Sequence, residues 1–169
     1  MKLIKTYILV VISTLMAILC SSCTKDQEPY KSPVIRVHGL FINSDSIKNI
    51  DTPVPVGDTL KINLGLECYI HDIEYFHINM DREYAKDSIL QQDFLEYCDP
   101  LYTNTKEGVY YFKPGVQNML ITLSIIPKRA KEDEKAGIPV SLSLKSKCNS
   151  GDDYNPFYVN FNYFITNKK

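Results

Sequence analysis

Apolar and polar residues alternate with a strict period of two over much of this chain. Between residues 58 and 68, apolar side chains occupy every even-numbered position from Leu60 to Cys68, and polar residues or glycine separate them. This is the period of a β-strand with one buried and one hydrated face. The same period predicts strands at 117–127, 138–144 and 157–165. Weaker alternation predicts three more, at 34–42, 73–80 and 109–112.

One segment follows a different pattern. Residues 82–97 carry an imperfect stripe of apolar and aromatic side chains at helical spacing, and they are predicted to form a helix. Strands that are hydrated on one face are typical of antiparallel sheets, because parallel strands are covered on both faces. We therefore predict an all-β fold, an antiparallel immunoglobulin-like β-sandwich of about seven strands with one short helical insertion. A small β-barrel is the alternative.

The N-terminal end has the pattern of a secretory signal. Lys2 and Lys5 give it a positive start, and residues 7–19 are almost wholly apolar. As a helix this stretch would rise about 20 Å, which is short of the roughly 30 Å hydrocarbon core that a transmembrane anchor must cross. A positive start, a short apolar stretch and small residues after it indicate a signal peptide that is removed.

Residues 19–23, Leu-Cys-Ser-Ser-Cys, resemble a bacterial lipobox. In such a motif small residues precede a cysteine whose thiol receives diacylglycerol before the peptidase cleaves in front of it. The resemblance implies that residues 1–22 are the signal peptide and that Cys23 is the lipidated first residue of the mature chain. Several acyl chains, at about 0.8 kcal/mol per buried methylene, hold a protein firmly at a membrane. Cys20 departs from the usual pattern and would leave with the signal, which disfavours a metal or redox motif at this cysteine pair.

A polar stretch with a proline separates Cys23 from the first predicted strand. We interpret residues 23–32 as a lipidated tether and residues 33–167 as a single domain. Signal and tether resemble those of exported lipoproteins of Bacteroides and its relatives, and the alternating domain resembles the small sandwich domains that such lipoproteins carry. In that family, acidic residues close to the lipidated cysteine, here Asp26 and Glu28, accompany display at the cell surface. The resemblance implies a lipid-anchored protein of the bacterial cell envelope, in the outer membrane.

Charge and missing motifs exclude several classes of function. Removal of residues 1–22 takes away two lysines and no acidic residue, which leaves 17 basic and 20 acidic residues and a net charge of −3. Nucleic-acid binding needs a concentrated basic face, so no nucleic-acid partner is expected. The chain has no phosphate-binding loop, no Gly-x-Ser-x-Gly elbow and no His-Glu-x-x-His helix. The sequence therefore predicts neither an enzyme nor a cofactor.

The histidines do not predict a metal site. His71 and His77 are six residues apart, so along one straight strand they would share a face but lie roughly 20 Å from each other. Asp152, Asp153 and Asn155 lack the glycine and the closing glutamate of a calcium loop. No metal ion is expected at either place.

Three cysteines follow Cys23 in the mature chain, namely Cys68, Cys98 and Cys148. Cys68 ends one predicted strand in its core phase, and Cys148 follows another strand in that strand's core phase. In an immunoglobulin-like order the two lie at the same end of the sandwich on opposite sheets. An exported protein meets oxidising conditions, so Cys68 and Cys148 are the candidate disulfide, with three buried free thiols as the alternative.

Three short segments resemble the Asp-Ser/Thr-apolar acceptor of O-linked glycans in exported proteins of the Bacteroides type. They imply modification at Ser46, Thr59 and Ser88. The segment around Thr59 also reads simply as the start of a strand.

Two classes of function remain. In the first, the domain is a non-catalytic binding or adhesion module for a glycan or protein ligand, because amphipathic tyrosine rings stack on sugars and anchor interfaces. The candidate tyrosines are Tyr69, Tyr75, Tyr154 and Tyr158. In the second, the domain is a structural or accessory subunit of an envelope assembly, recognised through a sheet edge. An exposed aromatic cluster would favour the first class, and a long uncovered edge strand would favour the second.

Overall fold

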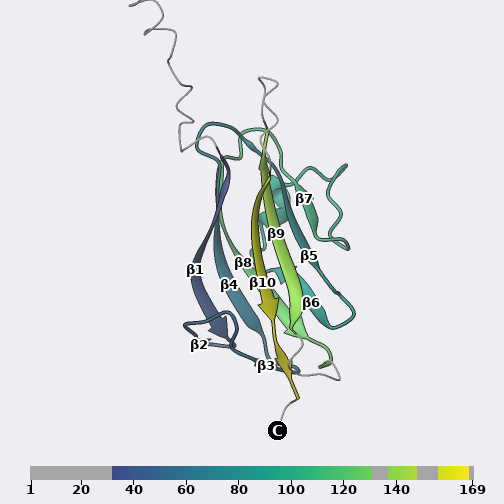
Figure 1. Ribbon diagram of the computed structural model, residues 1–169. Coiled ribbons are helices and arrows are strands. Elements are labelled where there is room, and N and C mark those ends of the chain that lie inside the picture. Colours follow the sequence, from purple (N-terminus) through teal and green to yellow (C-terminus); the bar gives the residue numbers. More distant parts are fainter. Residues whose placement is uncertain (1–31, 131–136, 148–155, 168–169) are drawn as a thin grey trace, which may run out of the picture.

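The alternating segments of the sequence form the long strands of two facing sheets (Figure 1). The computed structural model describes residues 32–130, 137–147 and 156–167. The larger sheet has the order β2 (Asp45–Ser46), β1 (Val34–Ile42), β4 (Leu60–Glu67), β8 (Asn118–Pro127) and β6 (Ala85–Ile89). The smaller sheet has the order β10 (Phe157–Tyr163), β9 (Ile138–Ser146), β5 (Ile73–Met80) and β7 (Val109–Tyr111). A parallel pair joins β11 (Ile165–Thr166) to β3 (Val54–Pro55).

The strand order is that of an immunoglobulin-like sandwich. One layer contains β1, β4, β8 and β6, and the other contains β10, β9 and β5, which matches the four-plus-three arrangement of constant-type immunoglobulin domains. The pairings within both layers are antiparallel. The two sheets do not close on each other, so the predicted β-sandwich is confirmed and the alternative barrel is wrong. Strand β7 follows β6 in the chain but is added to the free side of β5.

The core is formed by the inward positions that the period of two identifies. On β4 the inward residues Leu60, Ile62 and Leu64 are at most 1% exposed. The facing layer contributes side chains such as Phe76 and Leu142, which are equally inaccessible. Burial of one such side chain stabilises the fold by about 1.5–3 kcal/mol, so the alternating positions account for the packing of one sheet on the other.

The predicted helix over residues 82–97 is wrong. Its first part is the edge strand β6, which pairs with β8 from Ala85 opposite Pro127 to Ile89 opposite Leu123. Its last part is a single 3-10 turn, η1 (Phe94–Tyr97). The backbone hydrogen bonds offered by β8 and the burial of Ala85 override a weak helical stripe. No helix in the described part of the chain is long and apolar enough to cross a membrane.

Candidate binding surface

The outer face of the four-stranded sheet has an unusual set of side chains. Its positions alternate with inward-facing ones on each strand, so they are identified by the register. One row across the sheet joins Tyr158 of β10, Ser143 of β9 and His77 of β5. The neighbouring rows are Lys145, Tyr75 and Tyr111 on one side and Asn160, Ser141 and Asn79 on the other.

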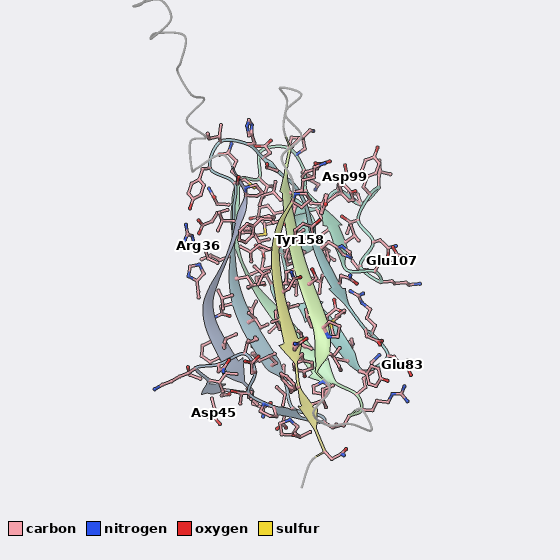
Figure 2. The ribbon with its side chains drawn as sticks, in the orientation of Figure 1. Arg36, Asp45, Glu83, Asp99, Glu107 and Tyr158 are labelled. Atoms are coloured by element: carbon pink, nitrogen blue, oxygen red, sulfur yellow. The ribbon has the colours of Figure 1, made fainter. Side chains whose placement is uncertain are left out.

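Four tyrosines form a strip across this face, which we call the tyrosine strip: Tyr158, Tyr75, Tyr111 and Tyr102. The ring centroids of Tyr75 and Tyr111 are 5.6 Å apart with an interplanar angle of 53°. Those of Tyr111 and Tyr102 are 6.0 Å apart at 56°. Tyr158 and Tyr102 are 57% and 66% exposed, so both ends of the strip are open to solvent. Figure 2 shows Tyr158 in front of β9 and β10.

The loop between η1 and β7 holds Tyr102 beside the sheet. The backbone amide of Asp99 donates to the carbonyl of Tyr111 over 2.7 Å. The hydroxyl of Thr103 donates to the same carbonyl over 3.3 Å and accepts the amide of Tyr111 over 3.1 Å. The carboxylate of Asp99 also accepts the amide of Leu101 over 2.9 Å. These bonds fasten the loop on both sides of Tyr102, so its ring has a fixed neighbour in Tyr111.

A hollow adjoins the strip. It has a volume of about 410 Å³ and is lined by Asn79, Ser141, Asn160 and Asn162, together with the acidic residue Asp81 and the apolar residues Met80, Pro139, Val140 and Phe161. We call the first four of these residues the amide hollow. Each asparagine side chain offers two N–H donors and one carbonyl acceptor, and each serine hydroxyl both donates and accepts. Asn160 is two residues from Tyr158 on the same face, so the amide hollow and the tyrosine strip form one continuous surface.

Ionic groups on this face are balanced. Lys145 forms an ion pair with Glu74, with Nζ and Oε2 3.2 Å apart. Burial, with a smaller contribution from Tyr158, raises the pKa of Tyr75 above its ordinary value, so its phenol stays neutral at physiological pH. The surface therefore combines neutral aromatic rings with hydrogen-bonding groups and little net charge.

Tyr69 lies in the link between β4 and β5, next to the five-stranded sheet and away from the tyrosine strip. Its hydroxyl donates to Oε2 of Glu67 over 2.5 Å and accepts from Nη2 of Arg36 over 2.9 Å. Arg36 also pairs with Glu67 through Nε at 2.9 Å. The hydrogen bond from Tyr69, reinforced by Arg36, holds the pKa of the Glu67 carboxyl below its ordinary value. Figure 2 places Arg36 beside β1, on the other side of the view from Asp99.

A second group of hollows lies over the five-stranded sheet. Three of them, of about 500, 380 and 310 Å³, share Leu120 of β8 in their lining. Leu120 is 72% exposed and pairs with Gly65 in the centre of the sheet. Tyr69 lines the second of these hollows, and His38 lines the third. The sequence-predicted tyrosines are thus divided between two faces, with Tyr75 and Tyr158 together and Tyr69 apart.

Several sequence-predicted sites fall outside the described residues. These are the lipidation site Cys23, the candidate ligand residue Tyr154 and Cys148 of the candidate disulfide. Among the glycosylation candidates, Ser46 is exposed on β2, whereas Thr59 and Ser88 are half-buried. Asp87, the acidic residue of the segment around Ser88, is engaged in an ion pair with Arg82.

The described cysteines Cys68 and Cys98 are buried free thiols. Burial raises the pKa of Cys68 to about 12 and that of Cys98 to about 11. Cys68 follows the last residue of β4, and the amide of Lys147, just after β9, donates to the carbonyl of Asp72 over 2.8 Å. The link between β4 and β5 therefore brings the ends of β4 and β9 together, as the candidate Cys68–Cys148 bridge requires. That bridge stays a prediction.

The prediction that His71 and His77 share one strand is wrong. His77 is in β5, but His71 is in the link that precedes this strand, because the chain crosses there from one sheet to the other. Within the described ranges, no group of three or more histidine, cysteine, aspartate or glutamate side chains is arranged to hold a metal ion.

Sequence reasoning missed half of the tyrosine strip and the whole amide hollow. Alternation alone places Tyr158, Asn160 and Asn162 on one face of a strand, which was a usable signal. Tyr111 and Tyr102 carried no comparable signal, because only the pairing of β7 with β5 brings them beside Tyr75.

Comparison of the chain with protein-family models, with curated proteins and with solved structures finds no match. Function must therefore be inferred from the surface itself.

Proposed function

We propose that this protein is a non-catalytic binding module whose ligand is a glycan held on the tyrosine strip. The observation that carries this proposal is the clustering of four tyrosines on one open sheet face, with two ring pairs within 6.0 Å. A phenol ring presents an apolar face to the C–H groups of a sugar and a polar hydroxyl at its edge. Groups that bind both the apolar and the polar parts of a sugar are thus present on one surface.

The amide hollow supports the same ligand. Sugar hydroxyls both donate and accept hydrogen bonds, and asparagine and serine side chains match them in both roles. A protein ligand would be expected to bury a larger apolar centre, whereas the hollow next to the strip combines three asparagines, a serine and the carboxylate of Asp81 with four apolar residues. The combination of rings and amides favours the glycan over the protein ligand.

A glycan array probed with the full chain, purified in detergent, tests the proposal. We expect binding to at least one glycan, and a loss of about tenfold or more in affinity for Tyr158→Ala. Tyr69→Ala, in the link next to the five-stranded sheet, is the matched control and should retain affinity. If Tyr69→Ala abolishes binding while Tyr158→Ala leaves it unchanged, the ligand surface is the five-stranded sheet and the proposal is wrong.

The alternative, a subunit of an envelope assembly, has an observation of its own. Strand β10 has β9 as its one partner strand among the described residues, so the other edge of its seven residues has no paired strand there and is the edge at which strand addition would occur. Proline at positions whose amides face away from β9 would block such an addition. A complex extracted from the envelope that survives Tyr158→Ala but is lost with these prolines would favour the assembly role.

We further propose that Cys23 carries the lipid that attaches this module to the bacterial cell envelope. The support is the lipobox-like sequence at residues 19–23 and the polar tether that follows it. Attachment through the segment that precedes β1 would leave both sheet faces of the domain available to a ligand. Placement in the outer membrane, and display at the cell surface, belong to the same proposal.

A further inference from the structure

We infer that the tyrosine strip and the amide hollow bind a single, soluble chain of a neutral glycan, as distinct from a charged glycan or the surface of a crystalline one. This inference rests on the proposed function and specifies its ligand class. Three features of the surface carry it: the tilt of the rings, the length of the strip and the charge around it.

The tilt of the rings excludes a flat ligand. A sugar that stacks on a tyrosine lies parallel to that ring, so sugars on neighbouring rings inherit the angle between the rings. Tyr75 and Tyr111 differ by 53°, and Tyr111 and Tyr102 differ by 56°. The surface of a crystalline polysaccharide presents its sugar rings in one plane and can lie flat on only one of these tyrosines at a time. A free chain can rotate about its glycosidic bonds and follow the tilts.

The strip is longer than one sugar ring. Tyr158 and Tyr75 come from β10 and β5, which are separated by β9 and therefore lie about 10 Å apart. From Tyr75 the strip continues by 5.6 Å to Tyr111 and by 6.0 Å to Tyr102. A ligand that contacts the exposed rings at both ends must therefore be an oligosaccharide that crosses the strands.

The charges around the strip do not suit an acidic glycan. Among the described outer-face residues of β5, β7, β9 and β10, the one lysine or arginine is Lys145, and its ammonium group is paired with the carboxylate of Glu74. The loop that carries Tyr102 also contributes Asp99, Lys106 and Glu107, a net negative set. Recognition of carboxylates or sulfates relies on arginine side chains or clusters of cations. The charged groups around the strip are an ion pair and a net negative set, so they do not provide such a site. Neutral hydroxyls instead match the asparagines of the amide hollow.

The experiment uses the full chain in detergent and three groups of probes. The first contains soluble neutral polysaccharides, namely mixed-linkage β-glucan, galactomannan, xylan and amylopectin, whose binding is followed by calorimetry and by affinity electrophoresis. The second contains polygalacturonate and chondroitin sulfate. The third contains microcrystalline cellulose and chitin, which are tested by co-sedimentation.

Each probe is tested with the unmodified chain, with Tyr158→Ala and with Tyr102→Ala. Both substituted residues are more than half exposed, so the fold should be preserved, and circular dichroism checks this. Tyr97→Ala is the matched control, because Tyr97 is 44% exposed but lines the hollow next to β8 instead of the strip. We expect at least one soluble neutral chain to bind, each strip variant to weaken it about tenfold or more, and Tyr97→Ala to change it less than about twofold.

Three results would overturn the inference, and they differ in what they leave standing. Strip-dependent binding of the charged or the crystalline probes alone would contradict the ligand class but support a glycan-binding module. Absence of strip-dependent binding to every probe would contradict both the ligand class and the proposed function. A protein ligand lost with Tyr158→Ala, without glycan binding, would have the same double consequence.

Discussion

Tyr163 is buried on β10, and its hydroxyl finds no hydrogen-bond partner among the described residues. A buried polar group without a partner costs about 1–3 kcal/mol, because it has lost its bonds to water. We expect Tyr163→Phe to leave the free energy of unfolding unchanged or to raise it by about 1 kcal/mol, as measured by urea denaturation. Tyr163→Ala is the contrasting variant, since the cavity should cost about 3–5 kcal/mol. A loss of more than about 1 kcal/mol for Tyr163→Phe would reveal a partner for the hydroxyl.

Cys98 is 2% exposed, and burial raises the pKa of its thiol to about 11. At pH 8 the buried thiol of Cys98 stays protonated, and the thiolate is the form that reacts. We therefore expect Cys98 to resist iodoacetamide in the folded protein and to react once urea unfolds it.

If the protein is exported, as proposed, any disulfide should join Cys68 to Cys148 and leave Cys98 as a thiol. Peptide mapping without reduction decides this. A peptide that links Cys98 to either of the other cysteines would contradict the arrangement.

At the scale of the element, β6 shows how a local ion pair depends on the strand geometry. Nε of Arg82 lies 2.9 Å from Oδ1 of Asp87, and Nη2 donates to the carbonyl of Ile78 over 2.9 Å. Residues five apart do not face each other on a helix, so the predicted helix would have separated Arg82 from Asp87. Because β6 is a strand, the carboxylate of Asp87 can reach Arg82, which also contacts β5. These contacts hold the connection between β5 and β6 in place.

We expect Asp87→Ala to lower the free energy of unfolding by about 2 kcal/mol, because it leaves the guanidinium of Arg82 without its charge partner. The carboxylate is only 5% exposed but Arg82 is 30% exposed, so the loss should be smaller than for a fully buried pair. Urea denaturation measures the change. Asp45→Ala, on the exposed strand β2, is the control and should stay within about 0.5 kcal/mol of the unmodified protein. Equal effects of the two substitutions would show that the pair contributes nothing.

The elements also show what the sequence could and could not predict. Seven of the strands follow from alternation, because a half-buried strand imposes a period of two on its own residues. Strand β6 could not be predicted in this way, because its five residues lack a clear alternation and form a strand through their pairing with β8. The tyrosine strip could not be predicted in full for the same reason, because Tyr111 and Tyr102 become part of it only through contacts between segments that are distant in the sequence. Pairing between distant segments was the missing information in both cases.

At the scale of the whole molecule, buried titrating groups predict sensitivity to alkali. Burial raises the pKa of Cys98 from 9.0 to about 11 and that of Tyr110 from 10.0 to about 12. It also raises the pKa of Cys68 to about 12 and that of Tyr163 well above its ordinary value. These groups are largely neutral in the folded and unfolded states below about pH 9, so they cause little change there. As the pH rises further, the unfolded chain releases these protons first, and the folded state is destabilised.

We therefore expect the free energy of unfolding to be flat up to about pH 9 and to fall between pH 9 and 12, by up to about 3 kcal/mol per group. Urea denaturation at a series of pH values measures this. Tyr110→Phe removes one of these groups and should make the decline shallower above pH 10. A profile that is flat to pH 12, or a decline that Tyr110→Phe leaves unchanged, would contradict the assignment.

In the proposed role, the attachment of the whole molecule depends on the thiol of Cys23. If Cys23 is the lipidation site, Cys23→Ala removes both the acceptor of the diacylglyceryl group and the residue at which the peptidase cleaves. We expect the variant to accumulate as an uncleaved precursor or a soluble form, whereas the unmodified protein partitions into detergent with the mass of a chain that starts at Cys23 and carries acyl chains. Cys20→Ala is the matched control, because Cys20 lies in the segment that is removed, and it should be processed normally. Detergent-phase partition and intact-mass measurement distinguish these forms. A Cys23→Ala protein that still partitions into detergent at the mature mass would show that another residue anchors the chain, and the tyrosine strip would then have to be placed relative to a different attachment point.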